Sequence, residues 1–283
     1  MSGLDRTVTS ATRVIALLGD PVIHSLSPRI QNAAFRAAGV DGVFVALRCE
    51  EEDLRGLLRG LAHAGGGGNV TLPHKGNAAV ALDEPSDAVR RTGACNTFWL
   101  EDGQVHGDNT DVEGFRRALR RFVKGPLEGR TVLLLGAGGA ARAALSVLVD
   151  EEVGETAVLN RSPERARSMI RRLGGDRSRV VESRSDLKGQ RFDLVINATR
   201  LGLSDEDELP VDPAREVETD AVLDLVYRPS ETALVKRARS LGLSALDGGE
   251  MLVQQGAVAF ERWWGVPAPV EVMHEALDGA RHP

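Results

Sequence analysis

The sequence predicts an α/β protein of two domains, in which parallel sheets are covered by helices. Strand-like and helix-like stretches alternate from one end of the 283 residues to the other. Residues 127–149 give the clearest unit, a buried apolar strand followed by a glycine turn and an alanine-rich helix. Such a βαβ rhythm implies parallel strands, and the length suffices for two ordinary hydrophobic cores.

The composition indicates a globular protein whose partner is a small molecule. Hydrophobic residues make up 42% and charged residues 27% of the chain. The 35 basic and 41 acidic residues leave a net charge of −6, which argues against nucleic acid or an anionic membrane as a partner. No apolar run approaches the roughly 18–20 residues of a membrane span. The first dozen residues lack the apolar core of a signal peptide, so we expect a cytoplasmic protein.

The cysteines and histidines predict no metal site. Cys49 and Cys95 are the only two cysteines, and they form no CxxC pair. The six histidines are scattered, without an HxxxH spacing. A disulfide framework and a zinc site of the Cys₄ or Cys₂His₂ kind are therefore excluded, and we expect no metal.

The first domain is expected to span residues 1–110 and to alternate strands with helices. Ser27 would cap a helix whose first residue is Pro28, and Gly39 would follow its end. A hairpin would turn at residues 102–103. The glycines at 65–68 would separate a helix from the strand that follows. The expected strands are 13–19, 43–48, 69–72 and a hairpin over 95–107, and the expected helices are 27–39 and 51–64.

The second domain is expected to span residues 111–247, and residues 248–283 form terminal helices that can pack back on the first domain. After a helix at 110–122 and the unit at 127–149, further αβ units follow. The expected strands are 155–160, 193–199, 221–226 and 244–247, and the expected helices begin near Pro163 and Ser230 or cover 250–265 and 269–280.

A dinucleotide-binding turn is predicted at "LLLGAGGAARAAL". Gly136, Gly138 and Ala141 fit the GxGxxA pattern directly after an apolar strand and at the start of a helix. The first glycine allows the tight turn, the second lets a pyrophosphate approach the backbone, and the alanine keeps helix and strand close. The amides of the helix N-terminus would bind the phosphates. The alternative is a glycine-rich turn without a ligand.

The residues after the next strand favour NADP over NAD. An NAD site usually places an acidic residue there to bind the ribose 2′-hydroxyl. This sequence has Asn160, Arg161 and Ser162 instead, with Arg165 one helical turn further on. Two guanidinium groups beside a hydroxyl suit a 2′-phosphate. The alternative is a solvated arginine face.

Lys75 is a candidate for proton transfer. In "NVTLPHKGN" Pro73 is expected at the first position of a helix, which puts Lys75 in the first turn. The helix dipole disfavours the charged form of a lysine there, so Lys75 could exchange a proton near neutral pH. The alternative is a surface lysine near a helix cap.

Asp111 is the candidate partner of Lys75. Thr110 and Glu113 fit a capping box, which places Asp111 in the first turn of a helix, where the dipole keeps a carboxylate ionised. Capping alone would also explain an aspartate there. At another expected helix start, Ser25 and Ser27 supply two hydroxyls for a carboxylate-sized anion, although N-capping by Ser27 is the simpler alternative.

Taken together, these motifs resemble the shikimate dehydrogenase family over nearly the whole chain. The resemblance is carried by the segments "SLSP", "NVTLPHK", "GACNT", "DNTD", "GAGGAARA", "NRSPERA", "NAT", "DLVY" and "EMLVQQ". It implies an N-terminal α/β substrate domain with a mixed sheet and a Rossmann-type, doubly wound parallel-sheet NADP domain. The C-terminal helices would return to the substrate domain.

The resemblance also implies a role for each site residue. Lys75 and Asp111 would form the catalytic pair. Ser25 and Ser27 would bind the substrate carboxylate with Tyr227 nearby, and the ring hydroxyls would contact Thr71, Asn96, Asp111 and Gln255. NADP would be held by Gly136, Ala137, Gly138, Gly139, Ala140, Asn160, Arg161, Ser162 and Arg165, and its nicotinamide side would be lined by Thr199, Leu225 and Gly248.

The implied activity is the NADP-dependent reversible reduction of 3-dehydroshikimate to shikimate. The enzyme would be an oxidoreductase of aromatic amino acid and chorismate biosynthesis, and we expect a monomer or homodimer. Leu26, Arg200 and Leu203 depart from the usual family pattern and leave the preferred polyol open. Quinate or aminoshikimate dehydrogenase is therefore an alternative on the same scaffold. A non-catalytic sensor of metabolite and nucleotide would not need Lys75 together with Asp111, and a folate dehydrogenase would not explain the hydroxyl-binding motifs.

Overall fold

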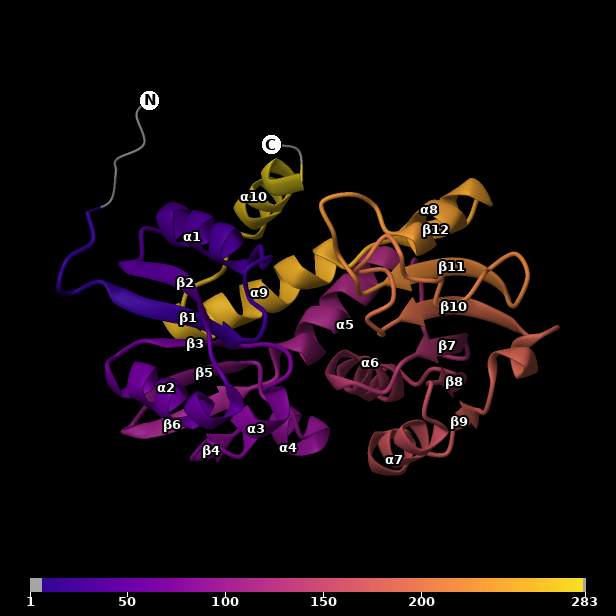
Figure 1. Ribbon diagram of the computed structural model, residues 1–283, viewed down its shortest axis with the longest axis horizontal. Coiled ribbons are helices and arrows are strands. Elements are labelled where there is room, and N and C mark those ends of the chain that lie inside the picture. Colours follow the sequence, from indigo (N-terminus) through magenta and orange to yellow (C-terminus); the bar gives the residue numbers. More distant parts are fainter. Residues whose placement is uncertain (1–6, 282–283) are drawn as a thin grey trace. The chain divides into compact units, whose positions relative to one another are not determined.

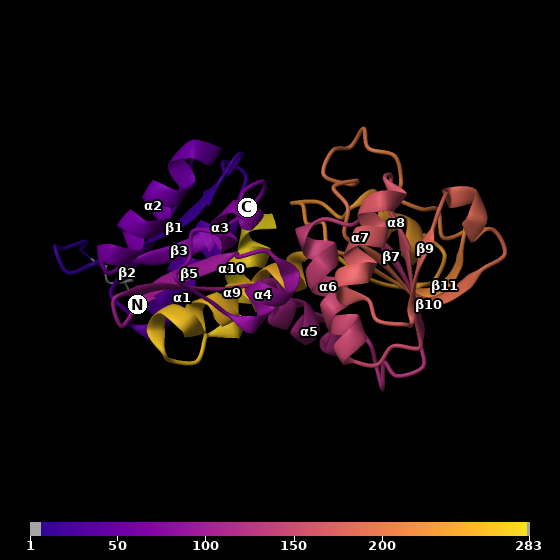
Figure 2. The same ribbon diagram turned by 90° about the horizontal axis from the view of Figure 1, so that it is seen from below.

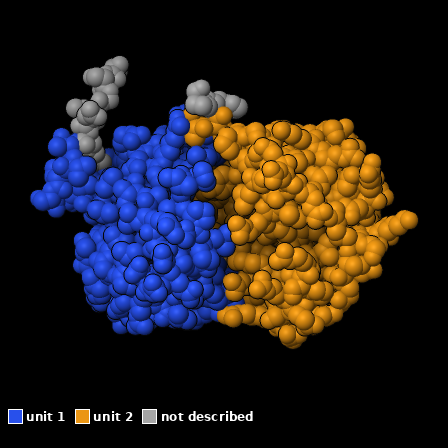
Figure 3. Space-filling model, in the orientation of Figure 1, with its two compact units in different colours: residues 1–110, 256–278 blue, residues 111–255, 279–283 orange. Residues whose placement is uncertain are grey.

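The computed structural model describes residues 7–281 and divides the chain into two compact units (Figure 3). Unit 1 comprises residues 1–110 and 256–278, and unit 2 comprises residues 111–255 and 279–283. The second division falls inside a single helix, α9 (Gly249–Trp264). The segment from residue 248 onward therefore contributes to both units.

Unit 1 is built on a mixed six-stranded sheet in the order β2-β1-β3-β5-β6-β4. Strand β1 is parallel to β2 and β3, and β5 is antiparallel to β3 and β6. The mixed sheet expected of the first domain is confirmed. The elements in chain order are β1 (Arg13–Gly19), α1 (Ser27–Ala38), β2 (Gly42–Arg48), α2 (Glu51–His63), β3 (Gly67–Val70), α3 (Lys75–Ala79), β4 (Glu84–Pro85), α4 (Asp87–Thr92), β5 (Thr97–Glu101) and β6 (Gln104–Asp108).

Helices cover both faces of this sheet, as Figure 2 shows with α2 on one side and α1 and α9 on the other. Leu54 and Leu58 of α2 belong to the buried cluster that includes Leu18 of β1. On the other face the ring centroids of Phe35 and Trp264 are 5.2 Å apart, and the indole nitrogen of Trp263 donates to the carbonyl of Phe98. Apolar burial on both faces thus fixes the sheet and docks the end of α9 on unit 1.

The glycine run is part of the sheet and not only a separator, so the expected strand start at residue 69 is wrong. Strand β3 begins at Gly67. A methyl group on Gly68 would lie 2.1 Å from the carbonyl oxygen of Ala16 and 2.8 Å from the ring of Phe98. The neighbouring strand and the Phe98 ring therefore leave no room for a side chain, which explains glycine at this position.

Unit 2 is a six-stranded parallel sheet in the order β12-β11-β10-β7-β8-β9, visible as a ladder of strands in Figure 1. This order has its switch point between β7 and β10 and is the doubly wound arrangement expected from the sequence. The elements are α5 (Thr110–Phe122), β7 (Thr131–Leu135), α6 (Gly139–Asp150), β8 (Glu155–Leu159), α7 (Pro163–Leu173), β9 (Ser178–Val181), the 3₁₀ helix η1 (Arg184–Leu187), β10 (Arg191–Asn197), β11 (Glu218–Asp224), α8 (Ala233–Ser240) and β12 (Ser244–Leu246), and the chain ends with α10 (Val270–Arg281).

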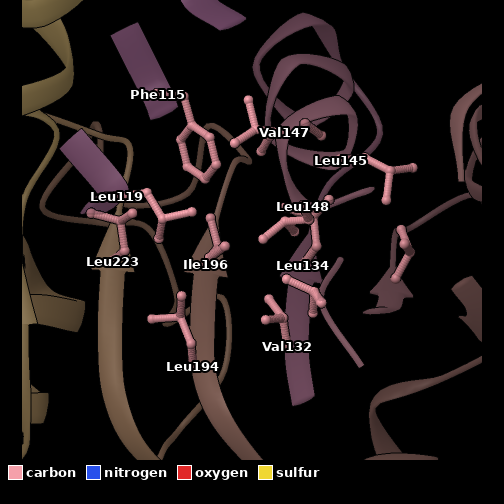
Figure 4. Close-up of a cluster of buried hydrophobic side chains, with 14 of the residues drawn as sticks. Phe115, Leu119, Val132, Leu134, Leu145, Val147, Leu148, Leu194, Ile196 and Leu223 are labelled. Carbon is pink, nitrogen blue, oxygen red and sulfur yellow. The ribbon is translucent and has the colours of Figure 1, made fainter. Parts of the chain in front are cut away.

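The core of unit 2 lies on both sides of its sheet. Figure 4 shows one side, where Phe115 of α5 and Leu148 of α6 point toward Leu134 of β7 and Ile196 of β10. Leu234 of α8 is part of a second buried cluster, together with strand residues of the opposite pleat. Strands buried on both faces read as continuous apolar runs, which is why the sequence predicts them well.

Some elements differ from the expectation. Helix α8 begins at Ala233 because the hydroxyl of Thr232 accepts from the amide of Val235, so the expected start near Ser230 is three residues early. The short elements β4, α4, β9 and η1 were not expected. Within residues 7–281 none of the helices combines the length and the apolar character that crossing a bilayer requires.

Candidate active site

One edge of the unit 1 sheet collects five of the predicted site residues. Strands β1 and β3 are parallel, so their carboxyl ends meet there, and the antiparallel strand β5 begins at the same edge. Loops at the carboxyl ends of parallel strands are the usual place for ligands in such sheets. The residues carried by these loops and by the first turns of α1 and α3 are Ser25, Ser27, Thr71, Lys75 and Asn96.

Lys75 is the first residue of α3, which follows a turn at residues 71–74. The expectation that Pro73 opens this helix is wrong, because His74 occupies the N-cap position. The buried ring of His74 is hydrogen-bonded through Nε2 to the carbonyl of Cys49, at 2.9 Å. The carbonyl of Lys75 accepts from the amide of Cys95 at 2.8 Å. These bonds fix the lysine-bearing turn to the residue after β2 and to the segment that carries Asn96.

Asn96 is oriented by three donors. Its Oδ1 accepts from the amide of Thr110 at 2.7 Å and from the hydroxyls of Thr110 and Thr97, each at 3.1 Å. The capping box expected from Thr110 and Glu113 does not form, because Thr110 bonds to Asn96 while Glu113 pairs with the arginines of its own helix. Asn96 thereby fixes the residue that precedes Asp111.

In the serine loop, Ser27 is not the cap that the sequence suggested. Leu26 occupies the N-cap position and Ser27 is the first helical residue. The Ser25 hydroxyl accepts from the Ser27 amide at 3.2 Å. At the base of the loop Asp20 pairs with Arg48 through both carboxylate oxygens, and the hydrogen bond from Arg48 lowers the pKa of Asp20.

The remaining predicted substrate residues, Asp111, Tyr227 and Gln255, belong to unit 2. Asp111 is buried in the first turn of α5, as expected. Helices α5 and α9 pack closely at Gly114, where an added Cβ would lie 2.6 Å from the Cα of Gln255. Asp111 is one helical turn before Gly114, so two predicted hydroxyl-binding residues come from neighbouring helices. Tyr227 is half-buried, three residues after the end of β11.

The glycine turn after β7 has the form that a dinucleotide requires. Gly136 has a φ of 110°, and a Cβ there would lie 2.8 Å from the carbonyl oxygen of Ala198. A Cβ on Gly138 would meet nothing within 4 Å, so this position is open to a ligand. Helix α6 begins at Gly139, and its N-terminal amides follow directly. The residues of this turn therefore fit a bound pyrophosphate.

We expect Gly136→Ala to lower the free energy of unfolding by about 1–3 kcal/mol, the cost of holding a non-glycine residue at a strained φ. Urea denaturation would measure the change. Gly138→Ala is the matched control, since its φ is −86° and its Cβ has room. This control should keep its stability while weakening NADP binding. A Gly138→Ala variant that is the less stable of the two would contradict this account.

The predicted 2′-phosphate residues lie between β8 and the first turn of α7. Ser162 is the N-cap residue of α7, and the side chain of Asn160 donates to its carbonyl at 2.8 Å. Arg161 and Arg165 are exposed, and neither guanidinium is paired with a carboxylate within residues 7–281. Most other arginines of unit 2 form ion pairs, for example Arg167 with Glu164. Two unpaired cations beside a helix N-terminus suit a phosphate.

The predicted nicotinamide-side residues are joined by a network that the sequence interpretation missed. Asn197 and Asp224, at the ends of β10 and β11, are fully buried and hydrogen-bonded to each other at 2.8 Å. The hydroxyl of Thr199 donates to Asn197 at 2.7 Å. A polar residue that ends an otherwise apolar strand, as both do in "LVINAT" and "VLDLVY", could have indicated them.

No group of three or more histidine, cysteine, aspartate or glutamate residues within the described part of the chain could hold a metal ion. The thiol next to Asn96 is also chemically quiet, because burial raises the pKa of Cys95 to about 12.

Three family models match successive parts of the chain. They are described as the shikimate dehydrogenase substrate binding domain, matching residues 17–98, shikimate / quinate 5-dehydrogenase, matching 118–203, and the shikimate 5′-dehydrogenase C-terminal domain, matching 248–277. The first two lie in unit 1 and unit 2, respectively, and the third overlaps α9 and α10.

Relatives match over nearly the full length. The NADP(+) shikimate dehydrogenase of Methanopyrus kandleri is 40% identical, with 96% of this chain and 97% of the relative covered. The shikimate 5-dehydrogenase of Thermus thermophilus, solved with NADP(H) and shikimate, is 38% identical with a TM-score of 0.85, covering 94% of this chain and 99% of that one. A 5-ketofructose reductase of Gluconobacter is 26% identical with a TM-score of 0.83, covering 96% and 100%. On the full-length identity to the dehydrogenases, the chain belongs to the shikimate dehydrogenase family.

Proposed function

We propose that the protein catalyses the NADP-dependent, reversible reduction of 3-dehydroshikimate to shikimate, as an oxidoreductase acting on a CH–OH group in aromatic amino acid biosynthesis. The observation that carries this proposal is the full-length identity of 38% to an enzyme solved with NADP(H) and shikimate. The site geometry supports it, because hydroxyl-binding side chains gather at one edge of unit 1 while unit 2 carries a dinucleotide turn with an arginine pair.

In this proposal unit 1 supplies most contacts to the substrate. Ser25 and Ser27 bind the carboxylate, and Tyr227 of unit 2 is assigned to the same group. Thr71, Asn96 and Gln255 bind ring hydroxyls, which suits Asn96 because its amide is held in one orientation. A pre-oriented donor costs no reorganisation when the substrate binds, so a rigid Asn96 favours both affinity and stereochemistry.

The cofactor contacts are proposed for unit 2. The turn from Gly136 to Ala140 holds the pyrophosphate, and Asn160, Arg161, Ser162 and Arg165 hold the 2′-phosphate. Thr199, Leu225 and Gly248 line the nicotinamide. Bound NADPH would supply the hydride for reduction of the C3 carbonyl.

Lys75 and Asp111 carry the proton chemistry. Lys75, as an ammonium group, donates a hydrogen bond to the carbonyl oxygen and gives up one proton to it as the alcohol forms. In the reverse direction the neutral amine takes that proton from the hydroxyl. Asp111 accepts a hydrogen bond from the substrate hydroxyl. The balance is one hydride and one proton added to one carbonyl group.

Initial rates with shikimate and with quinate, each with NADP and with NAD, test the proposal. We expect kcat/KM for shikimate with NADP to exceed each other combination by about tenfold or more, equivalent to about 1.4 kcal/mol of transition-state binding. A preference for quinate would move the assignment to the alternative on the same scaffold. A lack of turnover with every pair would favour a sensor or another carbonyl substrate, as in the 5-ketofructose reductase relative.

We also propose that the protein works in the cytoplasm as a monomer or homodimer that binds neither nucleic acid nor membranes. The net charge of −6 supports the exclusion of nucleic acid. Light scattering coupled to size-exclusion chromatography would give the mass of the particle for comparison with the chain mass of 30.3 kDa. A mass of three or more chains would contradict this part of the proposal.

A further inference from the structure

We propose that Asp224 is a positioning residue for the nicotinamide half of the cofactor site. The inference rests on the proposed function, because it concerns the same NADP site. Asp224 is the last residue of β11 and lies at the carboxyl end of the parallel sheet. Its contacts are with the protein, and its action on the cofactor is through the residues it holds.

The carboxylate of Asp224 is fully buried and accepts three hydrogen bonds. Oδ1 accepts from the side-chain amide of Asn197 at 2.8 Å and from the backbone amide of Val226 at 3.0 Å. Oδ2 accepts from the hydroxyl of Thr232 at 2.7 Å. These donors come from the end of β10, from the segment after β11 and from the residue that caps α8. One carboxylate thus joins three separate stretches of the chain.

Each predicted nicotinamide-side residue is hydrogen-bonded to a residue that itself donates to the Asp224 carboxylate. Thr199 donates through both its amide and its hydroxyl to Oδ1 of Asn197, whose Nδ2 donates to Asp224. The amide of Leu225 donates to the carbonyl of Asn197 at 2.8 Å. The amide of Gly248 donates to the carbonyl of Val226 at 3.0 Å. The loop, the strand end and the following turn therefore share one anchor.

The charges around Asp224 make it a costly residue for the fold. Burial raises its pKa to about 6, and the charged group that adds to this effect is Asp247, which is itself paired with Arg281. Its three hydrogen-bond partners, Asn197, Val226 and Thr232, are uncharged. A buried carboxylate without a cationic partner opposes stability, whereas a satisfied buried network fixes a unique geometry. In the proposal, the Asp224 network destabilises the fold but holds the nicotinamide-side loops in one geometry.

The test compares two ligands by titration calorimetry. One is NADP, and the other is adenosine 2′,5′-bisphosphate, which carries the 2′-phosphate but no nicotinamide. We expect Asp224→Ala to raise the Kd of NADP about tenfold and to leave the Kd of the bisphosphate within about twofold. Asp224→Asn keeps one acceptor oxygen and should recover part of the loss.

Asp193→Asn is the matched control. Asp193 lies in the same sheet, near the amino end of β10, and its carboxylate likewise accepts from the amide and hydroxyl of Thr131. It should leave both dissociation constants unchanged. If Asp224→Ala does not fold, Thr232→Val removes a single donor to the same carboxylate and takes its place.

Two outcomes overturn the proposal. Unchanged NADP affinity in the variants would show that the anchor does not act on the cofactor, and an equal loss for both ligands would show a general effect on unit 2. Failure of the proposed function is distinguishable, because it is measured on the wild-type protein. A wild-type protein that binds neither ligand has no NADP site, and the positioning role would fall with it, whereas a wild-type protein that binds NADP without turnover leaves the comparison of the two ligands intact.

A pH series supplies a second readout. The pKa of Asp224 is raised from 3.8 to about 6, so the folded protein binds more protons than the unfolded chain between these values. Stability relative to Asp224→Asn should therefore fall as pH rises from about 4 to about 6 and stay level above that. A difference in urea midpoint that does not change over this range would contradict a buried, ionising Asp224.

Discussion

Lys75→Ala is expected to lower kcat by about 10²–10⁴-fold, the range for loss of a general acid–base group. The turn that carries Lys75 is held by two hydrogen bonds. The amide of Cys95 donates to the carbonyl of Lys75 at 2.8 Å, and the ring of His74 is bonded to the carbonyl of Cys49. Alanine removes the ammonium group but leaves those bonds in place. The loss should therefore appear in kcat and kcat/KM together, as expected for a group that acts in the transition state.

Stopped-flow measurement of NADPH oxidation, with Lys124→Ala as the control, would check this result. Lys124 is an exposed lysine in the loop before β7, where removal of the charge should leave turnover unchanged. Calorimetric NADP binding should also survive in Lys75→Ala, because the cofactor residues belong to unit 2. Near-full turnover in Lys75→Ala would exclude the proposed proton transfer.

The double variant Arg161→Ala/Arg165→Ala is expected to lose about 10²–10⁴-fold in kcat/KM for NADP. Each guanidinium would make a charge-assisted hydrogen bond to the 2′-phosphate, and such bonds contribute about 1.5–3 kcal/mol each. NAD lacks this phosphate, so its kcat/KM should change little. The preference for NADP over NAD would therefore shrink by nearly the whole factor.

Arg171→Ala gives the matched control for the arginine pair, since Arg171 is an exposed residue in the last turn of the same helix, α7. It tests whether loss of positive charge alone weakens a polyanionic cofactor by long-range attraction. A rise of the NADP Michaelis constant with salt in the wild type, reduced in the double variant, would support direct contact. An equal loss for NADP and NAD would contradict the assignment to the 2′-phosphate.

Much of the fold could be predicted because both sheets bury apolar strands between helices. The run from residue 131 to residue 135 and the glycine turn after it identify unit 2 without any knowledge of its partners. Short elements escaped prediction because local sequence does not determine them. Strand β4 has only two residues. Strand β9 has the four residues "SRVV", a stretch too short to show the alternation of polar and apolar residues that identifies a strand.

The site was predicted best where a residue type is unusual for its place. A lysine after "TLP" and a basic loop after β8 both stand out in the sequence. The cap residues were predicted less well. Ser27 lies one position inside α1, and the hydroxyl of Thr110 donates to Asn96 and does not cap α5. The Asn96 and Asp224 networks join residues up to 27 positions apart, and only the tertiary structure brings such partners together.

The placement of the tryptophans has a spectroscopic consequence. All three, Trp99, Trp263 and Trp264, belong to unit 1, whereas unit 2 contains the single tyrosine, Tyr227. Intrinsic indole emission therefore reports the packing of one half of the chain only, while far-ultraviolet circular dichroism reports both. Denaturation followed by the two methods in parallel would separate the unfolding of the halves, and a shift of the dichroism curve alone on adding NADP would assign the ligand to unit 2.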